Sequence, residues 1–249
     1  MTTPTNRRLK VLVFDDDELH RQSAKFLLNR DYDLTVVSTY DEAQKALVPE
    51  LDYEKMYQIF ERLLEKAGLK HGFKPYQDGA SDEDKQKYRD AYREARELAT
   101  TYPDFDVVLA DLLVPASRQA QGDKGMKLVG QEMPLGTTII LYALVAGVTR
   151  VAVVTDMNHH NHPASAAFDY IDGQTCKLKG VNIICTNHVR MIITDEVTGE
   201  VVEPEFLRTD EGKAKYPEDK ETNERKGLVE GGKDWKSVLL RLTGDLKED

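Results

Sequence analysis

The chain has 249 residues, 40% of them hydrophobic and 31% charged, a composition that is ordinary for a globular protein with one sizeable core. Its formal net charge of -10 argues against nucleic acid as a partner, because phosphate binding depends on clustered Lys and Arg. No apolar run reaches the roughly 20 residues that a membrane span needs, and the first residues lack the apolar core of a signal peptide, so we expect a cytoplasmic protein with no membrane partner.

The first part of the chain predicts strands that alternate with helices. Residues 9–14 have the pattern of a short buried strand, and an amphipathic helix is expected at 18–29. A second strand is expected at 34–38, after which Thr39 or Asp41 can cap the next helix. This opening is typical of an α/β protein.

Residues 48–103 differ in character from the flanking chain. Their apolar residues follow a helical spacing, and a very polar helix is predicted at 82–99. The segment offers no convincing strand and is long for a connection. We therefore predict a helical insertion at 48–103, with the charge-rich helix as a solvated face or a docking surface.

The α/β pattern resumes after this insertion. Strands are predicted at 105–110, 150–155 and 181–186, and helices at 138–148 and 163–171, the first of them buried. Five strands that alternate with helices predict a doubly wound, five-stranded parallel sheet of the receiver or flavodoxin-like type, within a single domain that covers residues 1–249.

The end of the chain predicts an extension and a closing element. Residues 189–234 indicate a hairpin and loop, with Gly199 supplying a positive φ at the turn and a mobile mixed-charge loop at 209–232. The hairpin strands are expected at 191–194 and 200–203. An amphipathic helix at 235–246 is available to close the fold.

Two predicted strands end in acidic residues. The first stops at Asp15, Asp16 and Asp17, and the third stops at Asp111. Because the carboxyl ends of parallel strands lie at one edge of a sheet, these side chains should converge there. Crowded carboxylates repel each other unless a cation lies among them, and an oxygen-only set suits Mg²⁺. The alternative is that the first cluster only caps the following helix.

The acidic pair, the strand ends at 111–115 and 151–155, and Gly125 to Leu128 together resemble the receiver domains of two-component response regulators. The resemblance implies that Asp111 is the phosphoacceptor and that Asp15, Asp16, Asp111 and the backbone carbonyl of Leu113 bind Mg²⁺. Thr155 would be the switch hydroxyl. It also implies a histidine kinase or phosphotransfer protein as donor and, since the chain has no recognisable DNA-binding output module, a protein as output partner.

One departure from the receiver pattern affects the predicted activity. A receiver normally ends its fifth strand with a Lys that pairs with the phosphoacceptor, whereas this strand is followed by Asn187 and His188. Lys177, Lys179 and Arg190 would have to reach the site from an unusual direction. Loss of that cation would uncouple phosphorylation from movement, which makes a pseudo-receiver, a binding module without phosphorelay, the main alternative.

A second alternative is an enzyme. The first acidic cluster also resembles the first motif of haloacid-dehalogenase-like phosphatases, with Asp15 as the nucleophile and Asp17 as the acid/base. Thr155 would match the second motif, and Lys177 or Lys179 the third. The last acidic motif of that family is missing, because the strand at 181–186 has no Asp pair at its end.

Other metal-binding and thiol residues carry weaker signals. His159, His160 and His162 invite a zinc interpretation, but adjacent His side chains diverge and no fourth ligand has a familiar spacing, so a polar loop is preferred. Cys176 and Cys185 do not form a metal-type pair, and we expect both to be buried, reduced thiols.

Overall fold

The computed structural model describes residues 7–76, 79–117, 129–156, 162–202, 204–218 and 225–245. It divides into two compact units. One consists of residues 1–46 and 104–249, and the other is Leu47–Pro103. Among the helices of the described ranges, none combines the length and the apolar character that a membrane crossing requires.

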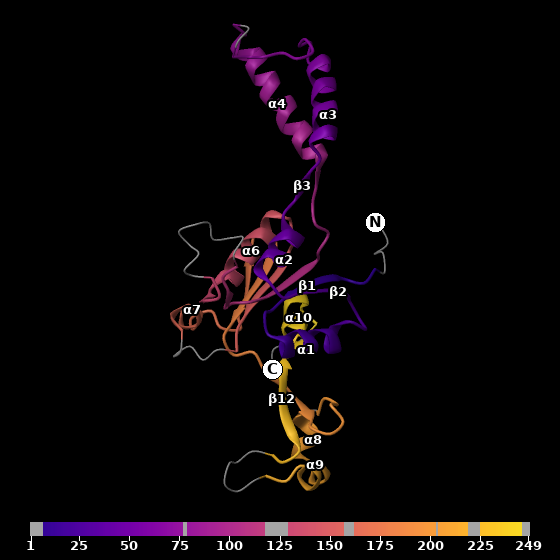
Figure 1. Ribbon diagram of the computed structural model, residues 1–249, viewed down its shortest axis with the longest axis vertical. Helices are drawn as coiled ribbons and strands as arrows, with labels where there is room; N and C mark the ends of the chain where they lie inside the picture. Colours follow the sequence, from indigo (N-terminus) through magenta and orange to yellow (C-terminus); the bar gives the residue numbers. More distant parts are fainter. Residues whose placement is uncertain are drawn as a thin grey trace. The chain divides into compact units, whose positions relative to one another are not determined.

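The larger unit is built on a mainly parallel sheet of six strands, with helices on both faces (Figure 1). The prediction of an α/β fold is confirmed, and the order β2-β1-β5-β8-β10 of the parallel strands is compatible with a flavodoxin-like fold. In sheet order the strands are β2 (Asp33–Val37), β1 (Lys10–Phe14), β5 (Val107–Asp111), β8 (Arg150–Val154), β10 (Val181–Thr186) and β9 (Thr175–Leu178).

The sixth strand, β9, corrects the prediction of five strands. It pairs antiparallel with β10 at the edge of the sheet, and Lys179 and Gly180 both have positive φ in the tight turn between them. The prediction that both cysteines are buried is wrong, because Cys176 belongs to this edge strand. Cys176 lies exposed on this edge strand, whereas Cys185 on β10 is half-buried and burial raises the pKa of its thiol to about 11.

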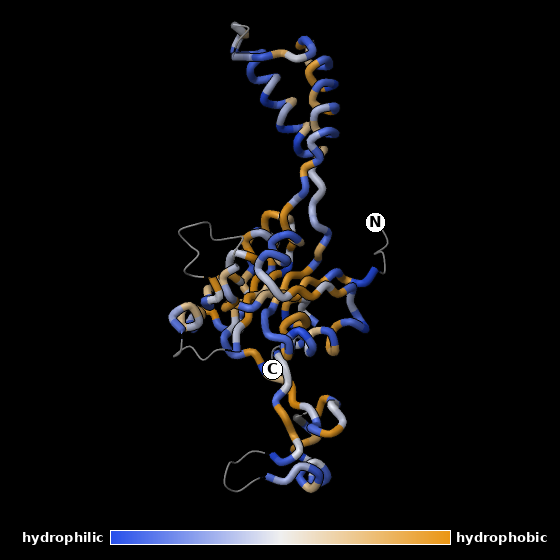
Figure 2. The backbone as a smooth tube through the Cα atoms, viewed as in Figure 1, coloured by the Kyte–Doolittle hydropathy of each residue, from blue (hydrophilic) through white to orange (hydrophobic). Residues whose placement is uncertain are grey.

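The core lies on both faces of the sheet. The central strands are apolar on both sides, as their colour shows in Figure 2, because helices cover both faces. On one face α1 (Glu18–Leu28) packs against α10 (Trp235–Thr243) and the inward side chains of the strands, with Trp235 fully buried. The closing helix thus begins where it is predicted.

The other face is covered by α2 (Tyr40–Leu47) and α6 (Leu135–Val145), which are joined by a hydrogen bond from Gln44 to Tyr142. The prediction of a buried helix here is only partly correct. One side of α6 faces β5 and β8, but Leu141 and Val145 are exposed. The short helix α7 (Pro163–Ala166) follows β8, and a small ribbon pairs β6 (Val114–Pro115) with β7 (Glu132–Met133).

Residues 191–233, called the arm below, correct the predicted hairpin and mobile loop. β11 (Met191–Asp195) pairs mainly with β12 (Leu228–Lys233), whereas the described part of the predicted second hairpin strand, residues 200–202, contributes an isolated bridge between Val201 and Thr194. Gly199 does have the predicted positive φ. The predicted loop contains β12 and a short helix, α9 (Asp210–Lys215), which packs with α8 (Pro204–Arg208).

The second unit, Leu47–Pro103, is a helical hairpin with its own core. α3 (Tyr53–Lys66) and α4 (Asp82–Ala99) begin at the side-chain caps Asp52 and Ser81. Their facing apolar residues include Phe60, whose ring meets that of Tyr88 edge to face at 5.1 Å. The two-residue strands β3 (Glu50–Leu51) and β4 (Thr100–Thr101) pair antiparallel, which brings the two ends of the unit together.

Candidate functional site

The strand register brings the two acidic strand ends together. Phe14 of β1 pairs with Ala110 of β5, so the residues that follow them, Asp15 and Asp111, reach the same edge of the sheet. Both side chains are buried. Gly136 at the start of α6 holds the backbone of Asp111 closely, because a Cβ at this position would lie 1.9 Å from the Asp111 carbonyl oxygen. Only glycine fits there without moving the strand end.

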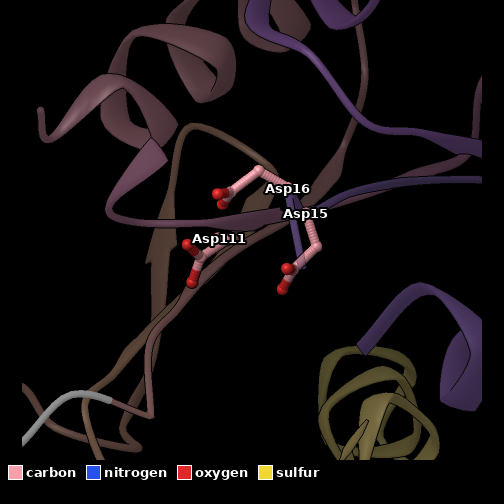
Figure 3. A group of neighbouring side chains, drawn as sticks. All are labelled: Asp15, Asp16 and Asp111. Atoms are coloured by element: carbon pink, nitrogen blue, oxygen red, sulfur yellow. The ribbon is translucent and has the colours of Figure 1, made fainter. Parts of the chain in front are cut away.

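Three carboxylates form the acidic cluster that the sequence predicts. Each of Asp15, Asp16 and Asp111 offers an oxygen atom within 4.8 Å of the others. Figure 3 shows the three side chains. Asp16 is the exposed member. The cluster lines a cavity of about 210 Å³, whose other lining residues are Asp17, His20, Leu113, Glu132, Thr155, Asp156 and Lys233.

Lys233 supplies a cation that the sequence analysis missed. Its ammonium nitrogen Nζ lies 2.8 Å from Oδ2 of Asp15 and 2.6 Å from Oδ1 of Asp111, and its side chain is 1% exposed. A third carboxylate, Asp156, lies 3.6 Å from the same nitrogen. Asp111 therefore does form an ion pair with a lysine, although this lysine comes from β12 and not from the end of β10.

The arm and helix α1 together hold this lysine in place. Lys233 is the last residue of β12 and pairs with Met191 at the base of the arm. Its backbone carbonyl lies 2.8 Å from Ser23 Oγ and shares the single proton of this hydroxyl with the His20 carbonyl. Gly232 packs so closely on α1 that a Cβ would lie 2.5 Å from the Leu19 carbonyl oxygen. The close approach of β12 to α1 thus directs the lysine side chain to the sheet edge.

The electrostatics of the cavity follow from an excess of carboxylates over cations. Burial raises the pKa of Asp111 to about 7, and the charge of Asp15 adds to this effect, while Lys233 opposes it. Partial burial and Asp15 also raise the pKa of Asp16. The surrounding carboxylates outweigh burial and raise the pKa of Lys233, which keeps it charged. The cluster retains a negative charge that one lysine does not neutralise.

The donor set of the cavity fits a hard divalent cation. The three clustered carboxylates offer only oxygen atoms, which Mg²⁺ prefers as ligands. Lys233 occupies one oxygen each of Asp15 and Asp111, and Asp15 Oδ1 accepts the Asp17 backbone N–H. Asp111 Oδ2 and the Asp16 carboxylate remain as the principal ligand atoms for a metal. Leu113 also lines the cavity, as a backbone ligand from this residue requires.

The remaining predicted site residues lie in different places. Thr155 follows β8, is buried and lines the cavity, with its backbone N–H bonded to the Thr186 carbonyl. Asp17 caps α1 by accepting the Leu19 N–H. The candidate cations Lys177 and Lys179 are exposed at the β9–β10 turn and do not line the cavity. Arg190 lies at the base of the arm, where its carbonyl accepts the Asp234 N–H.

The histidine cluster is only partly visible. His162 caps α7 by accepting the Ala164 N–H at Nδ1, which is a structural role. His159 and His160 lie outside the described residues. The zinc interpretation therefore gains no support from His162.

Four residues that line the cavity were absent from the predicted site: Lys233, Asp156, His20 and Glu132. Asp156 accepts a hydrogen bond from Nε2 of His20 at 3.2 Å. One signal for Lys233 was present in the sequence, since Lys233 directly precedes Asp234, the cap of the closing helix, as a lysine of a fifth strand would. The long arm sequence between β10 and Lys233 made this relation hard to detect.

Comparisons with known proteins found no match among protein-family models, curated proteins or solved structures. The function is therefore inferred from the geometry of the cavity and from the receiver resemblance of its strand ends.

Proposed function

We propose that this chain is a receiver-like signalling protein, phosphorylated on Asp111 in a Mg²⁺-dependent manner and acting through protein contacts. The observation that carries the proposal is the position of Lys233 Nζ between Asp15 and Asp111 at the carboxyl ends of β1 and β5. The strand at 181–186 has no lysine at its end, and the lack of a cation there is the main argument for a pseudo-receiver. With Lys233 in the cavity that argument loses its basis.

The chemistry follows from the arrangement of the charges. A carboxylate oxygen of Asp111 attacks the phosphorus of a phosphohistidine or a small phosphodonor, and the bond from phosphorus to the donor's leaving group breaks. Lys233 stays within reach of the carboxylate and offsets charge on the transferred group. Mg²⁺, held by Asp15, Asp16, Asp111 and the Leu113 carbonyl, would neutralise the remaining charge of the phosphoryl oxygens.

The response to phosphorylation would use residues that already line the cavity. Thr155 is the proposed switch hydroxyl, at the end of the strand next to that of Asp111. Lys233 connects the cavity directly to β12, so a change in its contacts acts on the arm and on the start of α10. A histidine kinase or phosphotransfer protein as donor and a protein as output partner fit this interpretation, and neither nucleic acid nor a membrane is required.

The phosphatase alternative has less support from the geometry. Asp15, its proposed nucleophile, has one oxygen bound to Lys233 and the other to the Asp17 N–H. Asp17, its proposed acid/base, is engaged in capping α1. Neither Lys177 nor Lys179 lines the cavity.

The proposal is tested by incubating the protein with acetyl phosphate and Mg²⁺ and locating any acyl phosphate by mass spectrometry. We expect the label on Asp111, no label in Asp111→Asn, and an unchanged reaction in Asp17→Asn, since Asn is an equally good helix cap. A label on Asp15, with turnover of a phosphate ester that Asp17→Asn abolishes, would establish the phosphatase instead. Absence of any label together with normal Mg²⁺ binding would favour the pseudo-receiver.

A further inference from the structure

His20 and Asp156 form an ion pair at the cavity that the receiver resemblance does not account for. His20 comes from α1, and Asp156 follows Thr155 after β8. Nε2 of His20 lies 3.2 Å from Asp156 Oδ2, while the other oxygen, Oδ1, lies 3.6 Å from Lys233 Nζ. The Asp156 carboxylate therefore stands between the His20 ring and the ammonium group of Lys233, the lysine that serves Asp111.

The two members of the pair differ in burial. The His20 side chain is 9% exposed, and the backbone around it is fixed because its carbonyl accepts hydrogen bonds from Ser23 Oγ and Trp235 Nε1. The Asp156 side chain is 42% exposed. The hydrogen bond from His20 lowers the pKa of Asp156 and keeps the carboxylate ionised. A buried histidine thus holds a more exposed carboxylate.

We propose that His20 and Asp156 act as a positioning pair for the phosphoacceptor site: Asp156 competes with the phosphoryl group for Lys233, and His20 restrains Asp156 from doing so fully. This inference rests on the proposed function and deepens it. The ammonium group has only three N–H donors, and Asp15, Asp111 and Asp156 already surround it. A phosphoryl group on Asp111 has to take a donor from one of these carboxylates, and Asp156 is the most distant of them.

The pair should therefore affect anions and cations in opposite directions. In Asp156→Asn the competing charge is gone, so an anion on Asp111 binds more tightly and Mg²⁺ binds more weakly, each by roughly 3- to 10-fold for one partly exposed charge. In His20→Leu the Asp156 carboxylate loses its restraint and turns to Lys233, so the anion binds more weakly while Mg²⁺ does not. His20→Gln keeps an N–H donor for Asp156 and should restore the anion affinity.

The chain contains its own reporter for this test. Trp235 is the only tryptophan, and its ring centroid lies 5.6 Å from Lys233 Nζ. Its fluorescence can be followed in the full chain during titration with Mg²⁺ alone and then with beryllofluoride, an analogue of the phosphoryl group. Glu132→Gln is the matched control, because Glu132 lines the same cavity and, within the described part of the chain, forms no ion pair with Lys233.

The expected result is that Asp156→Asn strengthens and His20→Leu weakens beryllofluoride binding, that the double variant behaves as Asp156→Asn alone, and that Glu132→Gln has a smaller effect on the anion. If His20→Leu weakens both ligands and Asp156→Asn does not mask it, the pair is merely structural and the inference fails. An equal effect of Glu132→Gln on beryllofluoride binding would also overturn the inference, because the loss of any one negative charge from the cavity would then explain the change in affinity.

The outcomes separate this inference from the proposed function. If the wild type binds Mg²⁺ but not beryllofluoride and forms no acyl phosphate, the proposed function fails, and the competition for Lys233 fails with it. If the wild type binds both ligands and the two variants shift neither, the proposed function stands and only the pair is refuted.

Discussion

Asp195 in the arm and Asp111 at the sheet edge are both buried aspartates that meet a lysine, but their surroundings differ. Asp195 accepts hydrogen bonds from the Tyr216 hydroxyl at 2.5 Å and from the backbone N–H groups of Val197 and Thr198, and it pairs with Lys215 at 3.2 Å. The Tyr216 bond and these backbone donors hold the pKa of Asp195 well below its usual range.

Asp111 has no comparable set of donors among the described residues. Lys233 is its hydrogen-bond partner, and this lysine is shared with Asp15 and Asp156. Burial therefore raises the pKa of Asp111. A carboxylate whose oxygens are all satisfied stabilises a local fold, whereas one that competes for a single cation has room for a metal ion or a covalent partner. By this comparison, Asp195 belongs to a structural site and Asp111 to a candidate reactive site.

The largest expected effect is on stability when Lys233 is replaced. Lys233→Met keeps the volume but leaves two buried carboxylates without a counter-charge, so the free energy of unfolding should fall by about 3–5 kcal/mol. Urea unfolding in Mg²⁺-free buffer measures this, and added Mg²⁺ should recover part of the loss. Lys215→Met is the matched control, since Lys215 is half-exposed, and it should leave stability close to that of the wild type. Equal losses in both variants would contradict the comparison.

A second prediction concerns the metal. Asp16→Asn removes a principal ligand and should weaken Mg²⁺ binding by roughly 10- to 100-fold, while it stabilises the metal-free fold by relieving repulsion from Asp15. Calorimetric titration and urea unfolding measure the two effects. Asp17→Asn, one residue away, changes a helix cap for an equivalent one, so it should leave stability unaltered and weaken Mg²⁺ binding much less than Asp16→Asn does. Unchanged Mg²⁺ affinity in Asp16→Asn would count against the site.

The two aspartates should also respond to pH in opposite ways. Asp111 has a folded-state pKa near 7, above its ordinary value of about 3.9, so its contribution to stability is present in acid and is lost as the pH rises through 7. Asp195 has a lowered pKa, so its contribution is present above about pH 4 and is lost only in stronger acid. In Mg²⁺-free buffer, the urea concentration at the unfolding midpoint should decrease as the pH is raised from 5 to 8.

Asp111→Asn isolates this pH effect. We expect its urea midpoint to change much less with pH over the same range. The protection factors of the Val197 and Thr198 amides, which correct the exchange rates for the intrinsic effect of pH, should stay constant in both proteins. An equally steep fall in Asp111→Asn would assign the pH dependence to another group.

The smallest effect is expected from removing the second unit. Its ends are adjacent through the pairing of Glu50 with Thr101 and of Leu51 with Thr100, and it has a core of its own. Replacing residues 49–102 by a short Gly-containing turn should leave the sheet folded and the Mg²⁺ response of Trp235 unchanged, because loop closure depends weakly on length. A deletion that yields only unfolded protein would show that this segment is part of the core.

The parallel strands and the acidic cluster could be predicted because their signals are local. Each parallel strand is a short apolar run, and all five predicted strands overlap the observed ones closely. Asp15 and Asp111 follow two of these runs, so a parallel sheet was sufficient to bring them together. β9 was missed because its short sequence, Thr175–Leu178, is mostly exposed at the sheet edge and has no apolar run.

Lys233 was missed because its position depends on long-range packing. The mixed-charge sequence before it indicates a loop, and nothing local predicts that β12 pairs with β11 or that Gly232 lies against α1. The same holds for the pair of His20 with Asp156, which joins the first helix to the end of the fourth parallel strand. Contacts across more than a hundred residues determine the charge balance of the cavity.

The most direct test of the account is a crystal structure with Mg²⁺ and beryllofluoride. The account predicts beryllium bonded to a carboxylate oxygen of Asp111, Mg²⁺ on Asp15, Asp16, Asp111 and the Leu113 carbonyl, and Lys233 Nζ in contact with a fluoride, with Thr155 turned toward it. An adduct on Asp15, or a cavity that takes up neither group while Lys233 keeps its contacts with Asp15 and Asp111, would contradict it.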